Sequence, residues 1–381
     1  MPQIDSALCI GLMSGTSLDG ADAVAVDFRR GDPVFRGRAH EPFAPDLRQE
    51  LLGLCSPGVN ELERAGQASL ALAEVYARAV DKLLSQTRIS RDRVLALGAH
   101  GQTVRHVPQR HFSIQLNNPA RLAELTGIDV IADFRSADLA AGGQGAPLVP
   151  AFHQKVFQSE TANRCIVNIG GIANITVLPS KASGKTVFGF DCGPGNILMD
   201  HWCQLRTGRP YDEDGAWAAS GLAQPDLLNR MLADPFFASA PPKSTGRELF
   251  NMEWLRSRIA QCGRSLRNRD IQATLLALTA RGIANAVTAY CPETEEIYLC
   301  GGGALNGALA REIAVLMPTR TIARTDELGV RAMDVEGMAF AWLAYAWIKG
   351  EAGNCPDVTG AAEPRRLGAL YPAPRSLRRA S

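Results

Sequence analysis

The chain has 381 residues, of which 46% are hydrophobic and 21% are charged, and its formal net charge is +1. These are the proportions of a soluble globular protein, and the length allows two domains of ordinary size. A net charge this small argues against a global field that would recruit nucleic acid or an anionic membrane, so we expect neither partner. Arginines gather among prolines in the C-terminal tail (Arg365, Arg366, Arg375, Arg378 and Arg379). We interpret this tail as a solvated end, with RNA binding as the alternative.

The nine cysteines are scattered singly, without a C-x-x-C pair or a Cys/His cluster at metal-ligand spacing. Unpaired cysteines are typical of a reducing compartment. The first residues lack the charged and apolar segments of a signal peptide, and no run of about 18 apolar residues occurs. The sequence therefore predicts a cytoplasmic protein without a transmembrane helix.

The first predicted elements are two strands, at 7–10 and 23–28, on either side of a loop rich in Gly, Ser, Thr and Asp. Backbone N–H groups and hydroxyls in such a hairpin tip can hold an anion, which predicts a phosphate cradle. The loop lacks the lysine and the following helix of a Walker A loop. Taken alone, the loop is better interpreted as an ordinary polar turn.

The next elements alternate between helices and strands. Helices are predicted at 47–54, 65–84 and 119–126, and strands at 93–97, 112–116 and 128–132. This alternation predicts an α/β fold with a mostly parallel sheet. Asp133, Arg135 and Asp138 follow the last strand, ahead of a glycine-rich stretch at 140–147 that we interpret as a hinge between domains. Charged groups at a carboxyl sheet edge suit a ligand crevice, and an Arg135–Asp138 salt bridge is the alternative.

The second half of the chain resembles the first. Strands are predicted at 165–169 and 173–178 around Gly170-Gly171, at 186–190 before a turn at 191–196, and at 296–300 before a turn at 301–304. Helices are predicted from about 197, at 225–233, 252–261, 271–290, 307–317 and 335–349. Backbone N–H groups at strand ends and helix starts favour phosphate-bearing ligands. Three such turns, in two halves that both begin strand–turn–strand, indicate a nucleotide site more strongly than any one of them.

This arrangement resembles the superfamily of sugar kinases, heat-shock chaperone ATPases and actin. Longer segments resemble one of its families, the anhydro-N-acetylmuramic acid kinases, over about residues 7–350. The matching segments are 13–20, 98–105, 132–135 with 140–150, 189–196, 241–251 and 300–306. Cys192 stands where the family more often has Thr, and Leu305 where a basic or polar residue is common. Neither departure removes a proposed catalytic group.

The resemblance implies an α/β fold of two ribonuclease-H-like (actin-like ATPase) lobes with an interlobe active-site cleft. We expect an N-terminal lobe of residues 1–140, joined by a C-terminal segment of about 350–381, and a C-terminal lobe of residues 141–349. The implied reaction opens the anhydro bond of 1,6-anhydro-N-acetylmuramic acid and transfers the γ-phosphoryl group of ATP to O6. The products are N-acetylmuramate 6-phosphate and ADP, as in peptidoglycan recycling, and Mg²⁺ should accompany ATP.

The resemblance also assigns residues. Asp191 is the expected base, because an inverting hydrolysis needs a carboxylate that activates water at C1. An aspartate that caps its own turn is the alternative. The expected ATP contacts are Gly15, Thr16, Ser17, Leu18, Asp19, Gly20, Ala21, Asp22, Gly193, Gly195 and Asn196 around the phosphates, with Gly301, Gly302, Gly303 and Ala304 facing adenosine. Asp19 and Asp22 are the expected Mg²⁺ contacts, through water.

For the sugar we expect contacts from Glu336, Arg135, His100, Gln102 and Asp133. A guanidinium suits the lactyl carboxylate of the substrate, which favours Arg135. Glu336 begins a helix, so compensation of the helix dipole is its alternative role. A hydrogen-bonded structural histidine is the alternative for His100.

Two other functions stay open at this point. An ordinary sugar kinase would use Asp191 to deprotonate a substrate hydroxyl. A nucleotide-switched, chaperone-like ATPase is disfavoured, because the sequence shows no separate peptide-binding domain. The expected ligands are the anhydro sugar and ATP, and a homodimer stays open.

Overall fold

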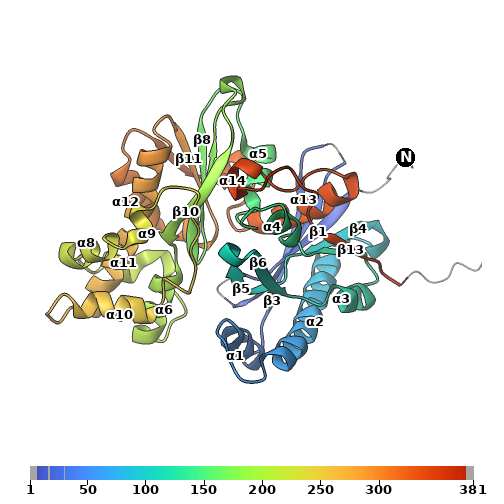
Figure 1. The fold of residues 1–381 in the computed structure, drawn as a ribbon, viewed down its shortest axis with the longest axis horizontal. Coiled ribbons are helices and arrows are strands. Elements are labelled where there is room, and N and C mark those ends of the chain that lie inside the picture. Colours follow the sequence, from blue (N-terminus) through green and yellow to red (C-terminus); the bar gives the residue numbers. More distant parts are fainter. Residues whose placement is uncertain (1–6, 16–17, 30, 375–381) are drawn as a thin grey trace, which may run out of the picture. The chain divides into compact units, whose positions relative to one another are not determined.

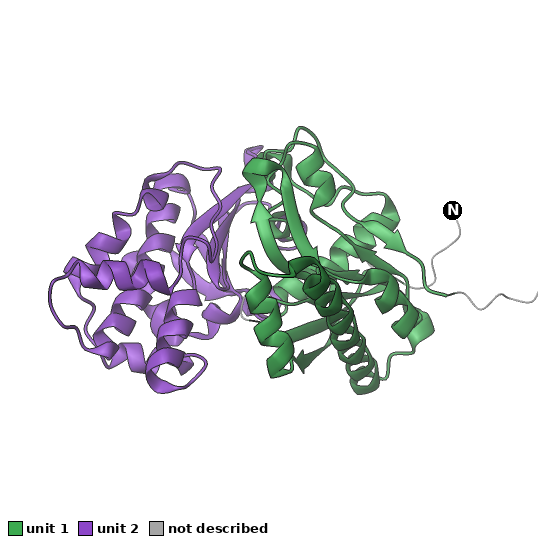
Figure 2. Cartoon of the chain, turned by 60° about the horizontal axis from the view of Figure 1, so that its bottom comes forward, with its two compact units in different colours: residues 1–152, 334–381 green, residues 153–333 purple. Residues whose placement is uncertain are grey.

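The structure is a computed structural model, and it describes residues 7–15, 18–29 and 31–374 (Figure 1). The chain divides into two compact units, one of residues 1–152 with 334–381 and the other of residues 153–333 (Figure 2). The division differs from the expected lobes of 1–140 and 141–349. In particular, helix α13 (Val335–Lys349) belongs to the first unit, because it packs against strand β1 (Leu8–Met13).

Within its described residues, the first unit contains a six-stranded sheet in the order β13-β7-β4-β1-β2-β3. The further strands are β2 (Gly20–Asp27), β3 (Val34–Pro42), β4 (Val94–Ala99), β7 (Val130–Ala132) and β13 (Ala369–Tyr371). The β1–β2 and β2–β3 pairs are antiparallel, whereas β1–β4 and β4–β7 are parallel. The central strands β1 and β4 are mostly buried, as parallel strands covered on both faces usually are.

Helices cover this sheet, and a separate ribbon extends from it. The helices are α1 (Pro45–Leu54), α2 (Glu61–Thr87), α3 (Pro119–Thr126), α4 (Ser136–Ala140), α13 and α14 (Pro356–Thr359). The ribbon pairs β5 (Gln102–Val107) with β6 (Phe112–Leu116). Helix α13 is apolar on all sides, which is typical of an enclosed helix. Glycines let it approach the sheet: an ideal Cβ atom at Gly98 would lie 2.9 Å from the carbonyl carbon of Phe340.

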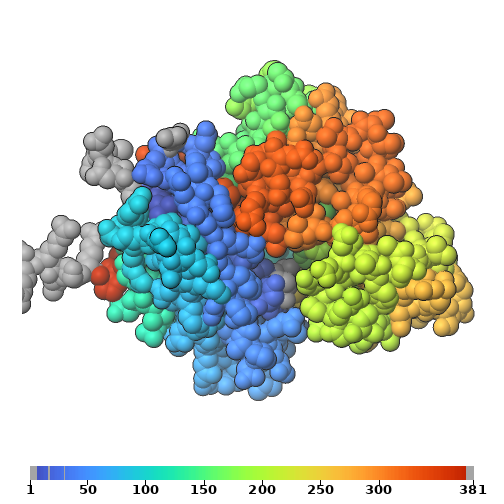
Figure 3. Space-filling model, turned by 180° about the vertical axis from the view of Figure 1, so that it is seen from behind, coloured from blue at the N-terminus to red at the C-terminus, as the bar shows by residue number. Residues whose placement is uncertain are grey.

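Within its described residues, the second unit contains a five-stranded sheet in the order β10-β9-β8-β11-β12. Its strands are β8 (Arg164–Ile169), β9 (Ile172–Leu178), β10 (Phe188–Pro194), β11 (Glu296–Cys300) and β12 (Thr321–Arg324). Its helices are α6 (Ile197–Thr207), α7 (Ala216–Ala219), α8 (Pro225–Leu232), α9 (Pro235–Ala238), α10 (Met252–Ala260), α11 (Asn268–Tyr290) and α12 (Gly307–Leu316), and α5 (Val149–Phe157) spans the point of division. In Figure 3 the helical segment coloured lime to amber forms one compact mass of side chains.

Both sheets share one topology. In each sheet, the first three strands form an antiparallel meander, the fourth pairs in parallel with the first, and the fifth pairs in parallel with the fourth. In the first unit β13 adds antiparallel beside β7. This strand order of third, second, first, fourth and fifth is that of a ribonuclease-H-like domain. The predicted α/β fold of two ribonuclease-H-like lobes is thereby confirmed. Among the described residues, every helix is too short or too polar to cross a membrane.

Candidate active site

The predicted phosphate hairpin joins β1 to β2, and Thr16 and Ser17 of its tip lie outside the described residues. Ser14 is buried, and its Oγ lies 2.9 Å from the Tyr76 hydroxyl of α2. Leu18 is also buried, has a left-handed backbone (φ 53°) and donates its N–H to the Gly15 carbonyl at 3.3 Å. The described residues on either side of the tip are therefore anchored, Ser14 by a hydroxyl pair and Leu18 by its buried side chain.

Two carboxylates of this hairpin differ in their surroundings. Asp19 is exposed, and its carbonyl accepts the N–H of Phe43 at 3.1 Å. Asp22 accepts a hydrogen bond from Arg38 at 2.8 Å, and the same oxygen lies 3.1 Å from Nδ1 of His40. Compensation by Arg38 disfavours Asp22 as a cation ligand.

Gly20 and Ala21 lie between these carboxylates and are both buried. An ideal Cβ atom at Gly20 would lie 2.7 Å from Nε2 of His40 on β3. A side chain larger than hydrogen does not fit there. The base of the hairpin is therefore packed closely against its neighbouring strand.

His100 and Arg135 meet at the end of β4. His100 is 5% exposed, and its Nε2 lies 2.7 Å from Nη2 of Arg135. Because a guanidinium only donates, Nε2 is the acceptor and the proton lies on Nδ1. That Nδ1 has no hydrogen-bond partner among the described residues. Burial, and then the charge of Arg135, hold the pKa of His100 well below its usual range, so the ring is neutral.

The two aspartates next to Arg135 have other partners. Asp138 is fully buried and accepts from Asn354, Thr359 and the Gly145 N–H at 2.6, 2.7 and 2.8 Å. The Arg135–Asp138 salt bridge considered above is therefore not formed. The exposed Asp133 accepts the Ser136 hydroxyl at 2.6 Å and so helps to begin α4.

More buried polar atoms lie on the ribbon and beside it. Gln102 is 2% exposed, and its Oε1 has no partner among the residues described. The same holds for Nε2 of His106 and Oδ1 of Asn117, two residues that the sequence analysis missed. Burial and the charge of Arg135 lower the pKa of His106 to about 4. Polar atoms of this kind suit the hydroxyl and amide groups of a sugar.

Glu336 lies in the first turn of α13 and is half-buried. It shares this turn with the fully buried Asp334. Both carboxylates are favoured by the positive end of the helix dipole. The position fits the sugar contact expected for Glu336 and its alternative role alike.

In the second unit, Asp191 lies on β10, an edge strand of the sheet. It is half-buried and opposes Asn174 on β9. Its N–H donates to the Lys243 carbonyl at 3.1 Å, and its Oδ2 accepts the Thr245 N–H at 2.9 Å. The carboxylate is thus held by a distant segment and does not merely cap its own turn.

The turn after Asp191 is built differently from the expectation. Gly193 has a φ of 136°, and an ideal Cβ atom there would lie 2.8 Å from the Phe237 ring. The N–H groups of Gly195 and Asn196 donate to the carbonyls of Gly171 and Gly170 at 2.9 and 2.8 Å. The expectation that this turn offers free amide donors is therefore wrong for these two groups, which tie the turn to the β8–β9 hairpin.

The third glycine turn follows β11. Gly301 has a φ of 78°, and its N–H donates to the Ala332 carbonyl at 2.9 Å. Gly303 and Ala304 are buried. Gly302 faces open space, since the nearest atom to an ideal Cβ there is Nδ2 of Asn196 at 3.7 Å. The structure thus brings the turns at 193–196 and 301–304 together within this unit.

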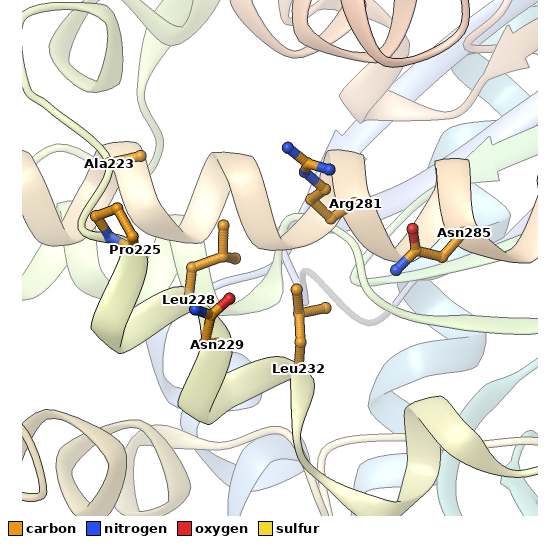
Figure 4. A pocket seen from close by; sticks show the side chains of 7 residues that line it. All are labelled: Ala223, Pro225, Leu228, Asn229, Leu232, Arg281 and Asn285. Atoms are coloured by element: carbon orange, nitrogen blue, oxygen red, sulfur yellow. The ribbon is translucent and has the colours of Figure 1, made fainter.

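A hollow elsewhere in the second unit does not belong to this site. It has a volume of about 330 Å³ and lies between α8 and α11 (Figure 4). Its lining consists of Ala223, Pro225, Leu228, Asn229, Leu232, Arg281 and Asn285. No predicted site residue lines it, so it is not the candidate active site.

Comparison with known proteins identifies the relatives of the chain. Residues 7–373 match the family described as "Anhydro-N-acetylmuramic acid kinase". Proteins of that name from Pseudomonas paraeruginosa and Chromobacterium violaceum are 54% and 51% identical over 366 residues, which cover 96% of this chain and 98% and 99% of theirs. A solved activator of the 2-hydroxyisocaproyl-CoA dehydratase from Clostridium difficile is 13% identical, with a TM-score of 0.48 over 90% of this chain and 96% of that one.

Proposed function

The chain belongs to the anhydro-N-acetylmuramic acid kinase family, and from that premise we propose how its residues carry out the reaction. The protein is an anhydro-N-acetylmuramic acid kinase of cell-wall recycling. In the proposed reaction, water opens the 1,6-anhydro bond and the γ-phosphoryl group of ATP is transferred to O6. The products are N-acetylmuramate 6-phosphate and ADP. The geometry of Asp191 is the observation that carries the site assignment.

Asp191 is the proposed general base. Water must attack C1 on the ring face opposite to the departing O6, and a carboxylate accepts its proton. The γ-phosphoryl group captures O6, so no side chain has to protonate the leaving oxygen. The N–H of Thr245, 2.9 Å from Oδ2, favours the ionised form that a base requires.

The phosphates of ATP would be held by the hairpin residues Gly15 to Asp22. At the second turn, Gly193 is a better candidate than Gly195 and Asn196, whose N–H groups are already bonded. The side chain of Asn196 donates from Nδ2 to the Ile169 carbonyl at 3.3 Å. Adenosine would lie against residues 301–304, where Gly302 leaves open space. Close approach of a ligand to the main chain is what glycine permits.

Mg²⁺ is the proposed companion of ATP, and Asp19 is the residue suited to hold it. Among the described residues there is no group of three or more His, Cys, Asp or Glu side chains that could hold a metal ion. Mg²⁺ commonly binds through one carboxylate, water and substrate phosphates, which an exposed aspartate satisfies. When bound, the ion neutralises charge on the phosphates. We drop Asp22 from this role because Arg38 compensates it.

The sugar would be recognised in the first unit by His100, Gln102, Arg135 and Glu336. Arg135 is the proposed contact for the lactyl carboxylate of the substrate, because a guanidinium presents paired N–H donors that match a carboxylate. Asp133, exposed and bonded to Ser136, is the weakest member of the predicted set. Cytoplasmic location and a homodimer remain proposals that rest on the sequence.

Replacing Asp191 by Asn tests the assignment. Product formation should fall below detection while ATP binding is retained, because the amide cannot accept the proton of water. Asp226→Asn is a matched control, since Asp226 is paired with Arg264 on the surface at 2.9 Å. Near-normal turnover in D191N would remove Asp191 from the role of base.

Oxygen-labelled water tests the reaction itself. The label should enter C1 of the product, and label in phosphate would indicate plain ATP hydrolysis. N-acetylmuramate without the anhydro bridge should be a poor substrate. Equal turnover of both sugars would favour an ordinary sugar kinase.

A further inference from the structure

We propose that the segment Lys243–Thr245 is a positioning clamp for Asp191, which holds its main chain and the Oδ2 atom of its carboxylate. This inference rests on the proposed role of Asp191. It extends the contact of the Thr245 N–H with Asp191 to a role for the whole segment. Thr245 and Lys243 act through Asp191 and are positioning residues.

Two hydrogen bonds fix Asp191 from the open edge of its strand. The first joins its backbone N–H to the Lys243 carbonyl at 3.1 Å, and the second joins its Oδ2 to the Thr245 N–H at 2.9 Å. One short segment thus holds both the main chain and the side chain of the same residue. A base held in this way keeps its second oxygen in a defined direction, which general-base catalysis requires.

Strand β10 has a β-bulge next to Asp191. The pairing of β10 with β9 shifts between Asp191 and Gly193, so Cys192 is the extra residue of a bulge. Bulges bend a strand and re-aim a side chain, and they are common next to active sites. A segment bonded to Asp191 beside the bulge stabilises the side-chain direction that the bulge creates.

The Lys243–Thr245 segment is anchored to an aromatic cluster. Nζ of Lys243 donates to the Phe236 carbonyl at 3.1 Å and lies 4.7 Å from the centre of the Phe236 ring. Phe236 packs on Phe250 and Phe250 on Trp254, with ring centres 5.5 and 5.2 Å apart. Contact with an aromatic cluster limits the movement of a segment that has no helix or strand of its own.

The active part of Thr245 is its N–H and not its side chain. The Thr245 hydroxyl oxygen is buried and has no hydrogen-bond partner among the described residues. Removal of the hydroxyl should therefore leave Asp191 in place. Removal of the N–H should release Oδ2 and favour the protonated acid. The two changes can be made separately, which gives the proposal a matched control.

Thr245→Pro removes the N–H, and Thr245→Val removes only the hydroxyl. Because loss of a donor to the carboxylate favours protonation, the acid limb of the kcat/KM profile of T245P should move to higher pH by about one unit. Its kcat should fall while its KM for ATP stays unchanged. T245V should keep the acid limb of the wild-type enzyme. Should T245P not fold, replacement of Thr245 by its α-hydroxy acid turns the same N–H into an ester oxygen.

The proposal is overturned if the N–H-deleted enzyme has the wild-type acid limb, or if T245V shifts it as far. Its failure is distinct from a failure of the proposed function. Turnover retained in D191N would refute the role of Asp191 as the base. An inactive D191N, together with an unshifted acid limb in T245P or the ester variant, would refute only the clamp.

Discussion

Replacement of Gly11 by alanine should destabilise the first unit, because α13 leaves no room for a Cβ atom on β1. An ideal Cβ atom at Gly11 would lie 2.6 Å from the backbone N of Ala341 and closer still to the Gly337 carbonyl oxygen. Ordinary contact begins at 3.4 Å. Both obstructing atoms belong to helix backbone, so neither can rotate away as a side chain could. Helix and sheet must separate by more than the difference between 2.6 and 3.4 Å, because the Gly337 oxygen is the nearer atom.

The cost follows from this geometry. Over-packing of a core usually costs about 1–3 kcal/mol, and a clash between two backbones belongs at the upper end, about 3 kcal/mol or more. For a domain of about 200 residues, 3 kcal/mol lowers Tm by roughly 6–12 °C. Activity should fall as well, because Glu336 lies at the N-terminus of the displaced helix.

Calorimetry and urea unfolding measure the effect, with Gly66→Ala as the matched control. Gly66 lies inside α2, and an ideal Cβ atom there meets nothing within 4 Å. Alanine in an open helix position should raise stability by about 0.5–1 kcal/mol. A G11A protein with the wild-type Tm would refute the reasoning, and so would a loss in G66A as large as that in G11A.

Three further predictions concern charge. Burial lowers the pKa of His153 to about 3, so the stability that depends on its neutral ring is fully present above about pH 6.5 and is lost toward pH 3. Over this range the free energy of unfolding should decline more steeply with acid in the wild type than in His153→Gln, by about 1.4 kcal/mol per pH unit. Urea titrations of the two proteins that run parallel would contradict this. Hydrogen bonds from Arg29 hold the pKa of Asp27 well below its usual range, although burial acts in the opposite direction. Asp27→Asn should therefore lower the free energy of unfolding by about 1–2 kcal/mol at pH 7. The difference in stability between the two proteins should shrink below about pH 4. A difference at pH 2 as large as that at pH 7 would count against that pairing. Asp19→Asn should raise the Mg²⁺ concentration for half-maximal turnover about tenfold, and an unchanged titration would remove Asp19 from the metal site.

The sequence predicts this fold best where one local signal is strong. The helix over Pro119–Thr126 begins with a proline after Asn118, whose side chain accepts the Arg121 N–H at 3.0 Å, and its predicted bounds are correct. The strand Glu296–Cys300 and the helix Val335–Lys349 are also predicted at their observed bounds, because each is a continuous apolar run with a clear end.

The sequence analysis misses elements that depend on their partners. Strands β3, β5 and β12 were not predicted, and the burial of β3 and β12 is mostly partial or absent. Strands of this kind carry polar side chains and form because a neighbouring strand offers its hydrogen-bonding edge. The membership of α13 in the first unit has a similar cause. The close approach of its backbone to Gly11 on β1 and Gly98 on β4 distinguishes this sheet face from another apolar surface.

The glycine turns show the limit of reading a site from residue types. Sequence alone predicts the same amide donors at Gly195 and at Gly302, because both follow a strand. Their surroundings differ: the Gly195 N–H is bonded to Gly171, whereas Gly302 faces open space. The hydrogen bond that holds Asp191 could not be predicted from residue types either, because its donor Thr245 lies 54 positions away in the sequence. A contact so distant in sequence leaves no local pattern, and for this reason the role of residues 241–251 could be noticed but not predicted. Under the proposed role of Asp191 as base, the chemistry that separates this enzyme from an ordinary sugar kinase depends less on its glycine turns than on how Asp191 is held.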